Sequence, residues 1–347
     1  MSNKKQRGVV LLTVVTMLLT VAAAAKNGSK VRKSGAEATE QKNAVLWRNP
    51  DDIKSRNLFY GPGGEEHAPH TQYTFEKEDM DGTSPKFIVR DDNGVKWKVK
   101  MGAEARPETV ASRLVWAVGY STNEDYFLPA LQVAEMPEHL RRGQKFVGPP
   151  GTVNNVRLKR YLDGEKKVGF WKWSDNPFTG TRELGGLRVM MALINNWDLK
   201  DNNNSIFHEK HANGADGPEN IYMVSDIGAS FGTTGVTLME KATDGNLHYY
   251  SSSKFLRKVT PTYVDFATPS SPVLLDIFYP PDFFMRMHLR WIGKRIPRED
   301  VRWVAQLLTQ LSPDQIRDAF RAAGYPPDEV EGFTRVLENR IAELGKI

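Results

Sequence analysis

Residues 196–203 read Asn-Trp-Asp-Leu-Lys-Asp-Asn-Asn, and residues 226–228 read Asp-Ile-Gly. The first stretch follows an apolar segment, residues 184–195, whose pattern predicts a buried helix. The second stretch follows residues 222–225, Tyr-Met-Val-Ser, which predict a strand. Polar loops that directly follow buried elements are held in place by them, so these two loops are the candidates for a functional site.

The residue types in the two loops suit phosphoryl transfer. That reaction needs a carboxylate to orient the attacking hydroxyl, an Asn and an Asp to hold magnesium, and a Lys to fix the nucleotide phosphates. The loops supply Asp198, Asn203 and Asp226, and residues 95–100, Val-Lys-Trp-Lys-Val-Lys, supply lysines earlier in the chain. A polar loop taken alone is more often a plain turn, but the second loop downstream favours the functional interpretation.

The same residues resemble a known family. Residues 198–203 look like the Asp-x4-Asn catalytic loop of protein kinases, and residues 226–228 look like their Asp-Phe-Gly metal motif. Residues 95–100 resemble the kinase strand that carries the phosphate-binding lysine, here Lys100. A helix that begins at Pro107 resembles the kinase helix whose glutamate pairs with that lysine, here Glu108.

The resemblance assigns a role to each residue. It implies that Lys100, positioned by Glu108, binds the phosphates of ATP, and that Asn203 and Asp226 hold Mg²⁺ or Mn²⁺. Asp198 would orient the acceptor hydroxyl. The expected activity is therefore that of an ATP-dependent phosphotransferase.

The sequence departs from ordinary protein kinases at three points. Asn196 and Trp197 replace the usual His-Arg, Ile227 replaces the usual Phe, and no Gly-x-Gly-x-x-Gly loop precedes the lysine strand. The pattern Asp-x-Gly-Ala-Ser-Phe is closer to atypical kinases such as phosphatidylinositol 3/4-kinase-like, HipA-like and secretory-pathway kinases. In such a protein residues 81–86 would form the phosphate loop, with Thr83 and Ser84 at the nucleotide.

Three of these assignments have neighbouring alternatives. Lys98 lies on the same strand face as Lys100 and is the alternative phosphate-binding lysine. Glu104 is the alternative partner of the lysine, although Glu108 lies inside the helical pattern. Of the residues that follow Asp201, Asn202 and Asn204 are alternatives to Asn203 as the metal ligand.

The wider pattern predicts an α+β, two-lobed, protein-kinase-like fold. Strand signals dominate residues 73–165, including a hairpin signal at residues 91–94, Asp-Asp-Asn-Gly, and this range is expected to form a small β-rich N-lobe. Residues 166–347 are expected to form a helical C-lobe. Its predicted helices include residues 298–311, 313–323 and 327–344, with start signals at Ser312-Pro313-Asp314 and Pro326-Pro327-Asp328.

The N-terminus differs from the rest of the chain. In residues 1–25, three basic side chains precede an apolar run that ends in four alanines, which is typical of a signal peptide. Residues 26–72 are expected to form a spacer and an irregular segment packed on the domain. The protein is therefore expected to be periplasmic or secreted. An uncleaved run would instead be a membrane anchor with the domain facing outward.

Composition limits the remaining function classes. With no cysteine, the chain cannot form disulfides, thiolate metal sites or a cysteine nucleophile. Its net charge of +5 does not indicate a nucleic-acid partner. The acceptor could be a protein, a lipid headgroup or a small molecule. Two alternatives to a phosphotransferase are a pseudokinase that binds without transfer and a related enzyme that transfers AMP.

Overall fold

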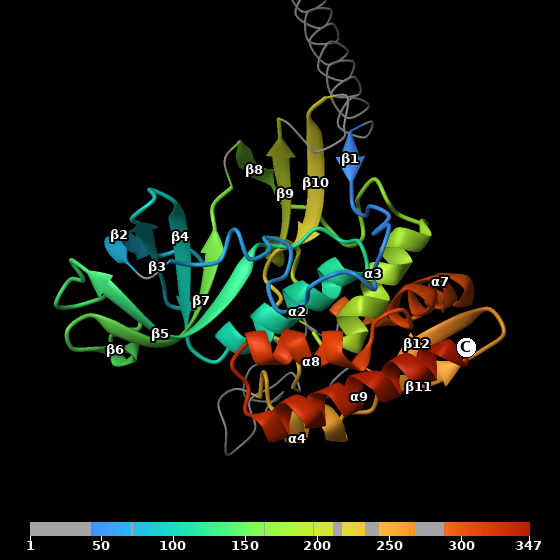
Figure 1. Cartoon of the computed structure of the whole chain (residues 1–347). Helices are drawn as coiled ribbons and strands as arrows, with labels where there is room; N and C mark the ends of the chain where they lie inside the picture. Colours follow the sequence, from blue (N-terminus) through green and yellow to red (C-terminus); the bar gives the residue numbers. More distant parts are fainter. Residues whose placement is uncertain are drawn as a thin grey trace, which may run out of the picture.

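The computed structural model describes residues 43–70, 72–162, 164–196, 198–210, 217–232, 243–267 and 288–347 (Figure 1). The predicted signal peptide, residues 1–25, and the spacer residues 26–42 lie outside the described residues. Within the described ranges, no helix has both the length and the apolar character that a membrane crossing requires.

A six-stranded sheet dominates the N-terminal part of the chain, with strand order β4-β3-β2-β5-β7-β6. Strand β4 pairs with β7 as well as with β3, so the strands from β4 round to β7 close on themselves. This sheet lies to one side of the helices (Figure 1). Its strands are β2 (Tyr73–Asp79), β3 (Lys86–Asp91), β4 (Lys96–Met101), β5 (Asp125–Ala134), β6 (Val147–Gly148) and β7 (Thr152–Arg160).

Side-chain alternation along β4 explains how the closed sheet is filled. Trp97, Val99 and Met101 are buried in its interior, as expected for alternate residues of a strand. Lys98 and Lys100 therefore lie on the outer face of the strand. The predicted hairpin between β3 and β4 is confirmed, with Gly94 at φ 82° in the left-handed region.

Helix α2 (Ala105–Ala117) follows β4 almost directly and occupies the range in which the sequence predicted a helix. It packs on β5 and β7 on one side and on α8 (Pro313–Ala322) on the other. Gly119 ends the helical segment at φ 97°, where its lack of a side chain lets the Arg48 carbonyl approach closely. Helix α2 therefore joins the closed sheet to the C-terminal helices.

The C-terminal part is α+β and less helical than predicted. A four-stranded sheet, with order β1-β10-β9-β8, and a three-stranded sheet, with order β11-β12-β13, lie among its helices. Helices α7 and α8 begin where the sequence predicted, and α9 occupies its expected range. The helices are α3 (Arg182–Leu193), α4 (Leu247–Ser252), α7 (Arg298–Leu308), α8 and α9 (Pro327–Gly345); the strands are β1 (Ala44–Val45), β8 (Glu165–Gly169), β9 (Asn204–Glu209), β10 (Glu219–Val224), β11 (Leu256–Val259), β12 (Tyr263–Phe266) and β13 (Ile296–Pro297).

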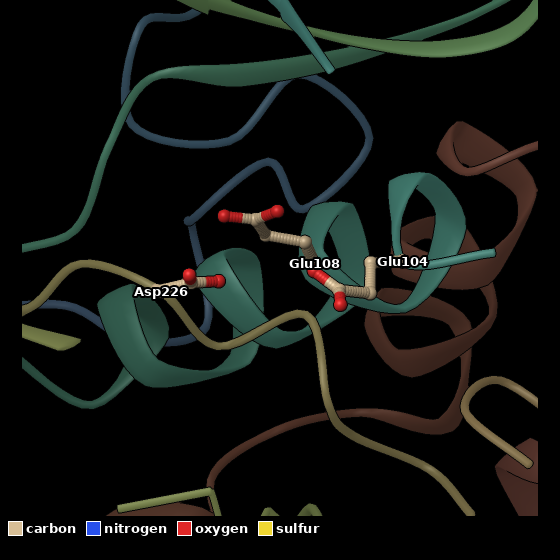
Figure 2. A group of neighbouring side chains, drawn as sticks. All are labelled: Glu104, Glu108 and Asp226. Atoms are coloured by element: carbon tan, nitrogen blue, oxygen red, sulfur yellow. The ribbon is translucent and has the colours of Figure 1, made fainter. Parts of the chain in front are cut away.

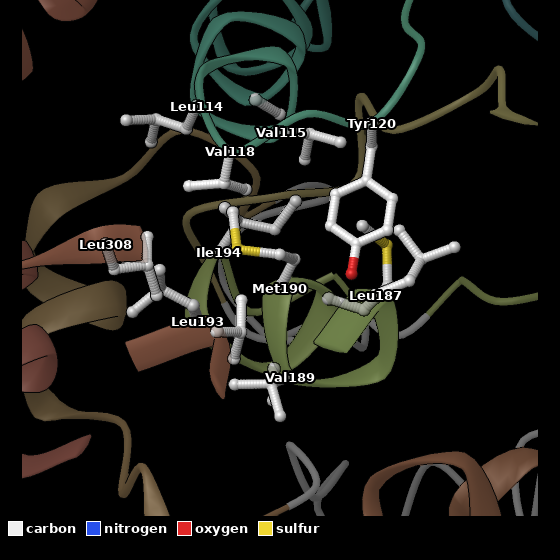
Figure 3. Close-up of a cluster of buried hydrophobic side chains, with 14 of the residues drawn as sticks. Leu114, Val115, Val118, Tyr120, Leu187, Val189, Met190, Leu193, Ile194 and Leu308 are labelled. Atoms are coloured by element: carbon white, nitrogen blue, oxygen red, sulfur yellow. The ribbon is translucent and has the colours of Figure 1, made fainter. Parts of the chain in front are cut away.

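Helix α3 lies at the centre of the large hydrophobic core. Leu187, Met190 and Leu193 pack with side chains of α2 and α7 (Figure 3). Gly185 and Gly186 let α3 approach α7 closely, because an added Cβ at Gly186 would lie 2.5 Å from the Trp303 ring. This packing fixes the end of α3, from which the loop of residues 196–203 begins.

Residues 43–70 form a largely irregular segment that packs on the domain. Strand β1 pairs in parallel with β10, and Leu46, Ile53 and Leu58 are buried in the large core. The Trp47 Nε1–H donates to the Val118 carbonyl at 2.6 Å, just past the end of α2. The segment therefore contributes to the folded domain and holds one end of α2.

Candidate active site

Lys100 lies at the centre of the candidate site. Its side chain is 2% exposed, and its Nζ lies 2.9 Å from Glu108 Oε2 and 3.1 Å from Asp226 Oδ1. A third carboxylate, that of Glu104, contacts the same ammonium group. Lys98 instead pairs with Asp79 at 2.7 Å, so it is Lys100 that lies among the three carboxylates.

Helix geometry places Glu104 and Glu108 together. Glu104 is the residue immediately before α2 and Glu108 lies one turn later, so both side chains leave the same side of the helix. Figure 2 shows both carboxylates near Asp226, which comes from the segment after β10. The sequence presented Glu104 and Glu108 as alternatives, whereas the structure brings both to Lys100.

The two polar loops meet through backbone hydrogen bonds. The N–H groups of Ser225 and Asp226 donate to the Asn203 carbonyl at 2.9 and 3.2 Å. The Asn203 Nδ2 group donates to the Asp198 carbonyl at 2.6 Å and to Asp198 Oδ2 at 3.2 Å. Lys200 Nζ lies 3.1 Å from the other carboxylate oxygen, Oδ1 of Asp198. The loops therefore form one structural unit.

The neighbours of Asn203 are in different environments. Asn204 is fully buried and its Nδ2 donates to the Trp171 carbonyl at 3.1 Å. Asn202 is exposed, and Asp201 accepts the Trp173 N–H at 3.2 Å. Of the three asparagines, Asn203 is the one whose side chain is hydrogen-bonded to Asp198.

The charges around Lys100 shift the pKa values of the site. Burial alone would lower the pKa of Lys100, but the carboxylates of Glu108, Asp226 and Glu104 raise it above its ordinary value. Burial alone would raise the pKa of Asp226, but the charge of Lys100 and its hydrogen bond, with smaller contributions from Arg157 and Lys86, lower it. Both groups are therefore charged at neutral pH.

Three acidic side chains of the site are close enough together to be considered as metal ligands. Ligand atoms of Glu104, Glu108 and Asp226 all lie within 4.8 Å of one another. The Lys100 ammonium contacts all three carboxylates, so these acids already share a cation. The better oxygen donors for Mg²⁺ are Asp226, whose side chain is 48% exposed, and the amide oxygen of Asn203, whose Nδ2 is turned towards Asp198.

The predicted phosphate loop between β2 and β3 is only partly connected to the site. Ser84 Oγ donates to Glu104 Oε2 at 3.2 Å. Thr83 is exposed, and its backbone carbonyl lies 3.5 Å from Arg142 Nη1. A Cβ added to Gly82 would lie 3.3 Å from Lys86 Nζ, which places that lysine under the loop. The structure therefore brings Ser84 to the carboxylates around Lys100, whereas Thr83 is exposed to solvent.

Two buried residues of the site were missed from the sequence. Arg157 on β7 is the Cα partner of Lys100 on β4, and its Nη2 lies 2.8 Å from Glu108 Oε1. Its Nη1 lies 3.3 Å from Oδ1 of Asp125, a carboxylate on β5. In residues 156–160 charged residues alternate with apolar ones, a pattern typical of a strand with one solvent-exposed face. The pairing of β4 with β7 instead places Arg157 beside Lys100, where it is buried.

A cavity of about 510 Å³ lies away from this cluster. It borders the start of α2 at Gly102 and Arg106, the β7 residues Asn154 and Asn155, and Tyr325 before α9. Neither Lys100 nor Asp226 lines it. The cavity and the candidate active site are therefore separate places in the described part of the chain.

No protein-family model matches this chain, and no curated protein sequence matches it. Among solved structures it is similar to a proinflammatory kinase of Helicobacter pylori, CtkA, at 11% identity and a TM-score of 0.43, over 80% of this chain and 97% of that one. It is also similar to the Golgi casein kinase, at 9% identity and a TM-score of 0.38, over 85% of this chain and 76% of that one.

A second structure of the Golgi casein kinase, with Mn/ADP bound, is similar at 10% identity and a TM-score of 0.36, over 81% of this chain and 72% of that one. All three solved structures are of kinases. At this level of similarity, activity has to be argued from the residues of this chain itself.

Proposed function

We propose that this chain is an atypical-kinase-like phosphotransferase that uses ATP with Mg²⁺ or Mn²⁺ and acts on a hydroxyl acceptor outside the cytoplasm. One observation carries the proposal. Lys100 on β4 and Glu108 on α2 are eight residues apart, and they form one ion cluster with Asp226, which lies 126 residues after Lys100. The loop of Asp198 and Asn203 is hydrogen-bonded directly to the Asp226 segment.

Each residue then has a role that its contacts support. The Lys100 ammonium, held by Glu108, binds phosphate oxygens of the nucleotide. Asp226 and the Asn203 amide oxygen would hold the divalent ion, whose positive charge would offset that of the phosphates. Asp198 has one oxygen hydrogen-bonded by Asn203 and the other paired with Lys200, so its carboxylate is oriented to accept a hydrogen bond from the acceptor hydroxyl.

The ion pairs of the cluster also explain how the buried charge of Lys100 is compensated. Lys100 would be an uncompensated buried charge if its carboxylate partners were absent. Asp226, which is half exposed, can exchange Lys100 for a metal ion while Glu104 and Glu108 keep the lysine paired. The proposed site is therefore preorganised for nucleotide and metal binding.

A thermal-shift titration tests the proposal. The purified protein is titrated with ATP in the absence and presence of MgCl₂ or MnCl₂, beside Asp226→Ala and the control Asp92→Ala. Asp92 is exposed in the turn between β3 and β4. We expect metal-dependent stabilisation by ATP in the parent protein and in Asp92→Ala, and its loss in Asp226→Ala.

The same samples separate the candidate reactions. Incubation with ATP labelled at the γ-phosphate or at the α-phosphate, with protein, lipid and small-molecule acceptors, shows which group is transferred. Transfer of the γ-label supports a phosphotransferase, and transfer of the α-label would indicate AMP transfer. Metal-dependent binding without any transfer would point to a pseudokinase. A parent protein that ATP and metal do not stabilise would refute the nucleotide site itself.

A further inference from the structure

Both carboxylate oxygens of Glu108 are held by cations from two different strands. Oε2 lies 2.9 Å from Lys100 Nζ on β4, and Oε1 lies 2.8 Å from Arg157 Nη2 on β7. The Glu108 side chain is 1% exposed and that of Arg157 is 5% exposed. Water is therefore excluded from this contact, and a charge-assisted hydrogen bond is strong in such a place.

We propose that Arg157 is a positioning residue for nucleotide binding: it fixes the Glu108 carboxylate so that this carboxylate keeps Lys100 aimed at the phosphates. The inference rests on the proposed function. Arg157 itself does not face the nucleotide in this assignment. It acts through Glu108 on Lys100.

The strand pairing explains why Arg157 suits this task. Strand β7 pairs with β4 on one side and with β5 on the other, so its backbone is fixed on both edges. Arg157 lies directly opposite Lys100 in the β4–β7 register. Its planar guanidinium group can hold one carboxylate with Nη2 and another with Nη1, which an ammonium group cannot do with the same fixed geometry.

The need for a second cation follows from what Lys100 has to do. In the structure Lys100 is shared among Glu104, Glu108 and Asp226. Phosphate binding turns part of its hydrogen-bonding capacity towards the nucleotide. If Lys100 were the single partner of Glu108, the Glu108 carboxylate would then be less firmly oriented. Arg157 keeps the Glu108 carboxylate in one orientation in both states.

A purely structural role would be different. Asp125 on β5 is buried, its Oδ1 lies 3.3 Å from Arg157 Nη1, and neither of its oxygens has a hydrogen bond within the described residues. Arg157 could therefore serve only to balance the buried charge of Asp125. The two roles predict different effects of removing Asp125 from a protein that lacks Arg157. Removing Asp125 restores the charge balance and should restore stability, but it does not restore the contact that orients Glu108.

The experiment compares variants at Arg157 with the parent protein and with a matched control. Arg157→Gln removes the cation, Arg157→Gln with Asp125→Asn removes it together with its buried counter-charge, and Arg157→Lys keeps one cationic donor. Arg160→Gln is the matched control, because Arg160 lies on the same strand and pairs with Glu124 at 3.9 Å, away from Glu108. Unfolding midpoints and the Kd for ATP with Mg²⁺ are measured for each.

If Arg157 is a positioning residue, the double variant should recover stability without recovering affinity for ATP. We expect Arg157→Gln to lose both stability and affinity. The double variant should regain most of the stability but bind ATP at least about tenfold more weakly than the parent. Arg157→Lys should recover part of the affinity, and Arg160→Gln should bind as the parent does. In a Glu108→Gln background, Arg157→Gln should add less than about a twofold further loss, because both changes act on one contact.

Two results would overturn the inference. One is parent-like ATP affinity in the double variant, since this would leave Arg157 with charge balance alone. The other is parent-like affinity in folded Arg157→Gln. If the parent protein does not bind ATP with metal, the proposed function fails first and the positioning role falls with it, so the two failures are distinguishable.

Discussion

Asp226 donates its backbone N–H to the carbonyl oxygen of Asn203 at 3.2 Å. Ser225 donates to the same oxygen, and its hydroxyl group also donates to it at 3.1 Å. The two proposed metal ligands therefore belong to one hydrogen-bonded unit, although one follows α3 and the other follows β10. A change in either loop is transmitted directly to the other.

Asp198→Asn should separate binding from transfer. The amide oxygen can still accept a hydrogen bond from Asn203 or from Lys200, but the amide cannot orient the acceptor hydroxyl as a carboxylate does. We expect the transfer rate to fall by about 100-fold to 10,000-fold while the Kd for ATP changes little. Asp201→Asn is the control in the same loop, because Asn can still accept the Trp173 N–H. Equal rates for both variants would contradict the role of Asp198.

Lys100→Met and Lys98→Met should differ, although both lysines lie on the same face of β4. Loss of Lys100 leaves three carboxylates without their shared cation, and we expect a cost of about 3 kcal/mol in unfolding free energy and the loss of ATP binding. Lys98→Met breaks one partly exposed pair with Asp79, at a cost of about 1 kcal/mol or less. Urea unfolding and ATP titration measure both. If Lys98→Met weakened ATP binding more than Lys100→Met, Lys98 would be the phosphate-binding lysine.

Gly228→Ala should disturb the site without disturbing the core. A Cβ at Gly228 would lie 2.8 Å from Glu104 Cβ and 2.9 Å from its Oε2, so Glu104 has to move away from Lys100. We expect a several-fold weaker affinity for ATP with Mg²⁺. Gly217→Ala is the control, because a Cβ there meets no atom within 4 Å. If both variants bind ATP equally well, the contact of Glu104 with Lys100 is unimportant for binding.

Asp125 should make stability depend on pH. Burial raises its pKa from the ordinary 3.8 to about 6, although Arg157 opposes this. Between these values the folded state binds more protons than the unfolded state, so stability falls as the pH rises from about 4 to about 6. In Asp125→Asn this decline, up to about 3 kcal/mol, should be absent.

Urea unfolding of the parent protein and Asp125→Asn at pH 4.5 and pH 7 checks the sign. The stability of the variant relative to the parent should rise between these two pH values. Arg157 stays charged at both pH values, so its attraction to Asp125 follows the ionisation of Asp125 and is already contained in the shifted pKa. A constant difference between the two proteins would contradict the raised pKa of Asp125.

Removal of residues 43–72 should unfold the domain, whereas removal of residues 1–42 should not. The first deletion removes β1 from its pairing with β10 and takes Leu46, Ile53 and Leu58 out of the core. Burial of each side chain contributes about 1.5–3 kcal/mol. The three contributions together amount to a large part of the free energy of unfolding of a typical domain. Circular dichroism and thermal melts of chains that begin at residue 43 and at residue 73 make the comparison.

The sequence was informative where a signal is local. Helix α8 begins at Pro313 behind a capping box of Ser312 and Gln315, and such signals lie within a few residues. The β3–β4 hairpin was likewise predicted from its Asn-Gly turn. The α+β class and the grouping of Lys100, Glu108 and Asp226 could also be predicted, because the motifs occur in a fixed order along the chain.

Non-local pairing accounts for what could not be predicted. The closure of the sheet by β4 and β7 places Arg157 beside Lys100, and no pattern within either strand indicates that contact. The two small sheets of the C-terminal part include strands of two residues, β1 and β13, which are too short to leave a periodic signal. The sequence favoured Glu108 over Glu104 as the partner of Lys100, whereas the structure brings both carboxylates to that lysine.

The double pairing of β4 also limits how the lysine can move. A strand at the edge of a sheet can peel away or accept a new strand, but β4 has hydrogen-bonded neighbours on both sides. Displacing Lys100 by its backbone would require breaking two ladders at once. The position of its ammonium group can thus be adjusted by side-chain rotation or by motion of the whole closed sheet with α2, and amide hydrogens of β4 should be among the slowest in the chain to exchange.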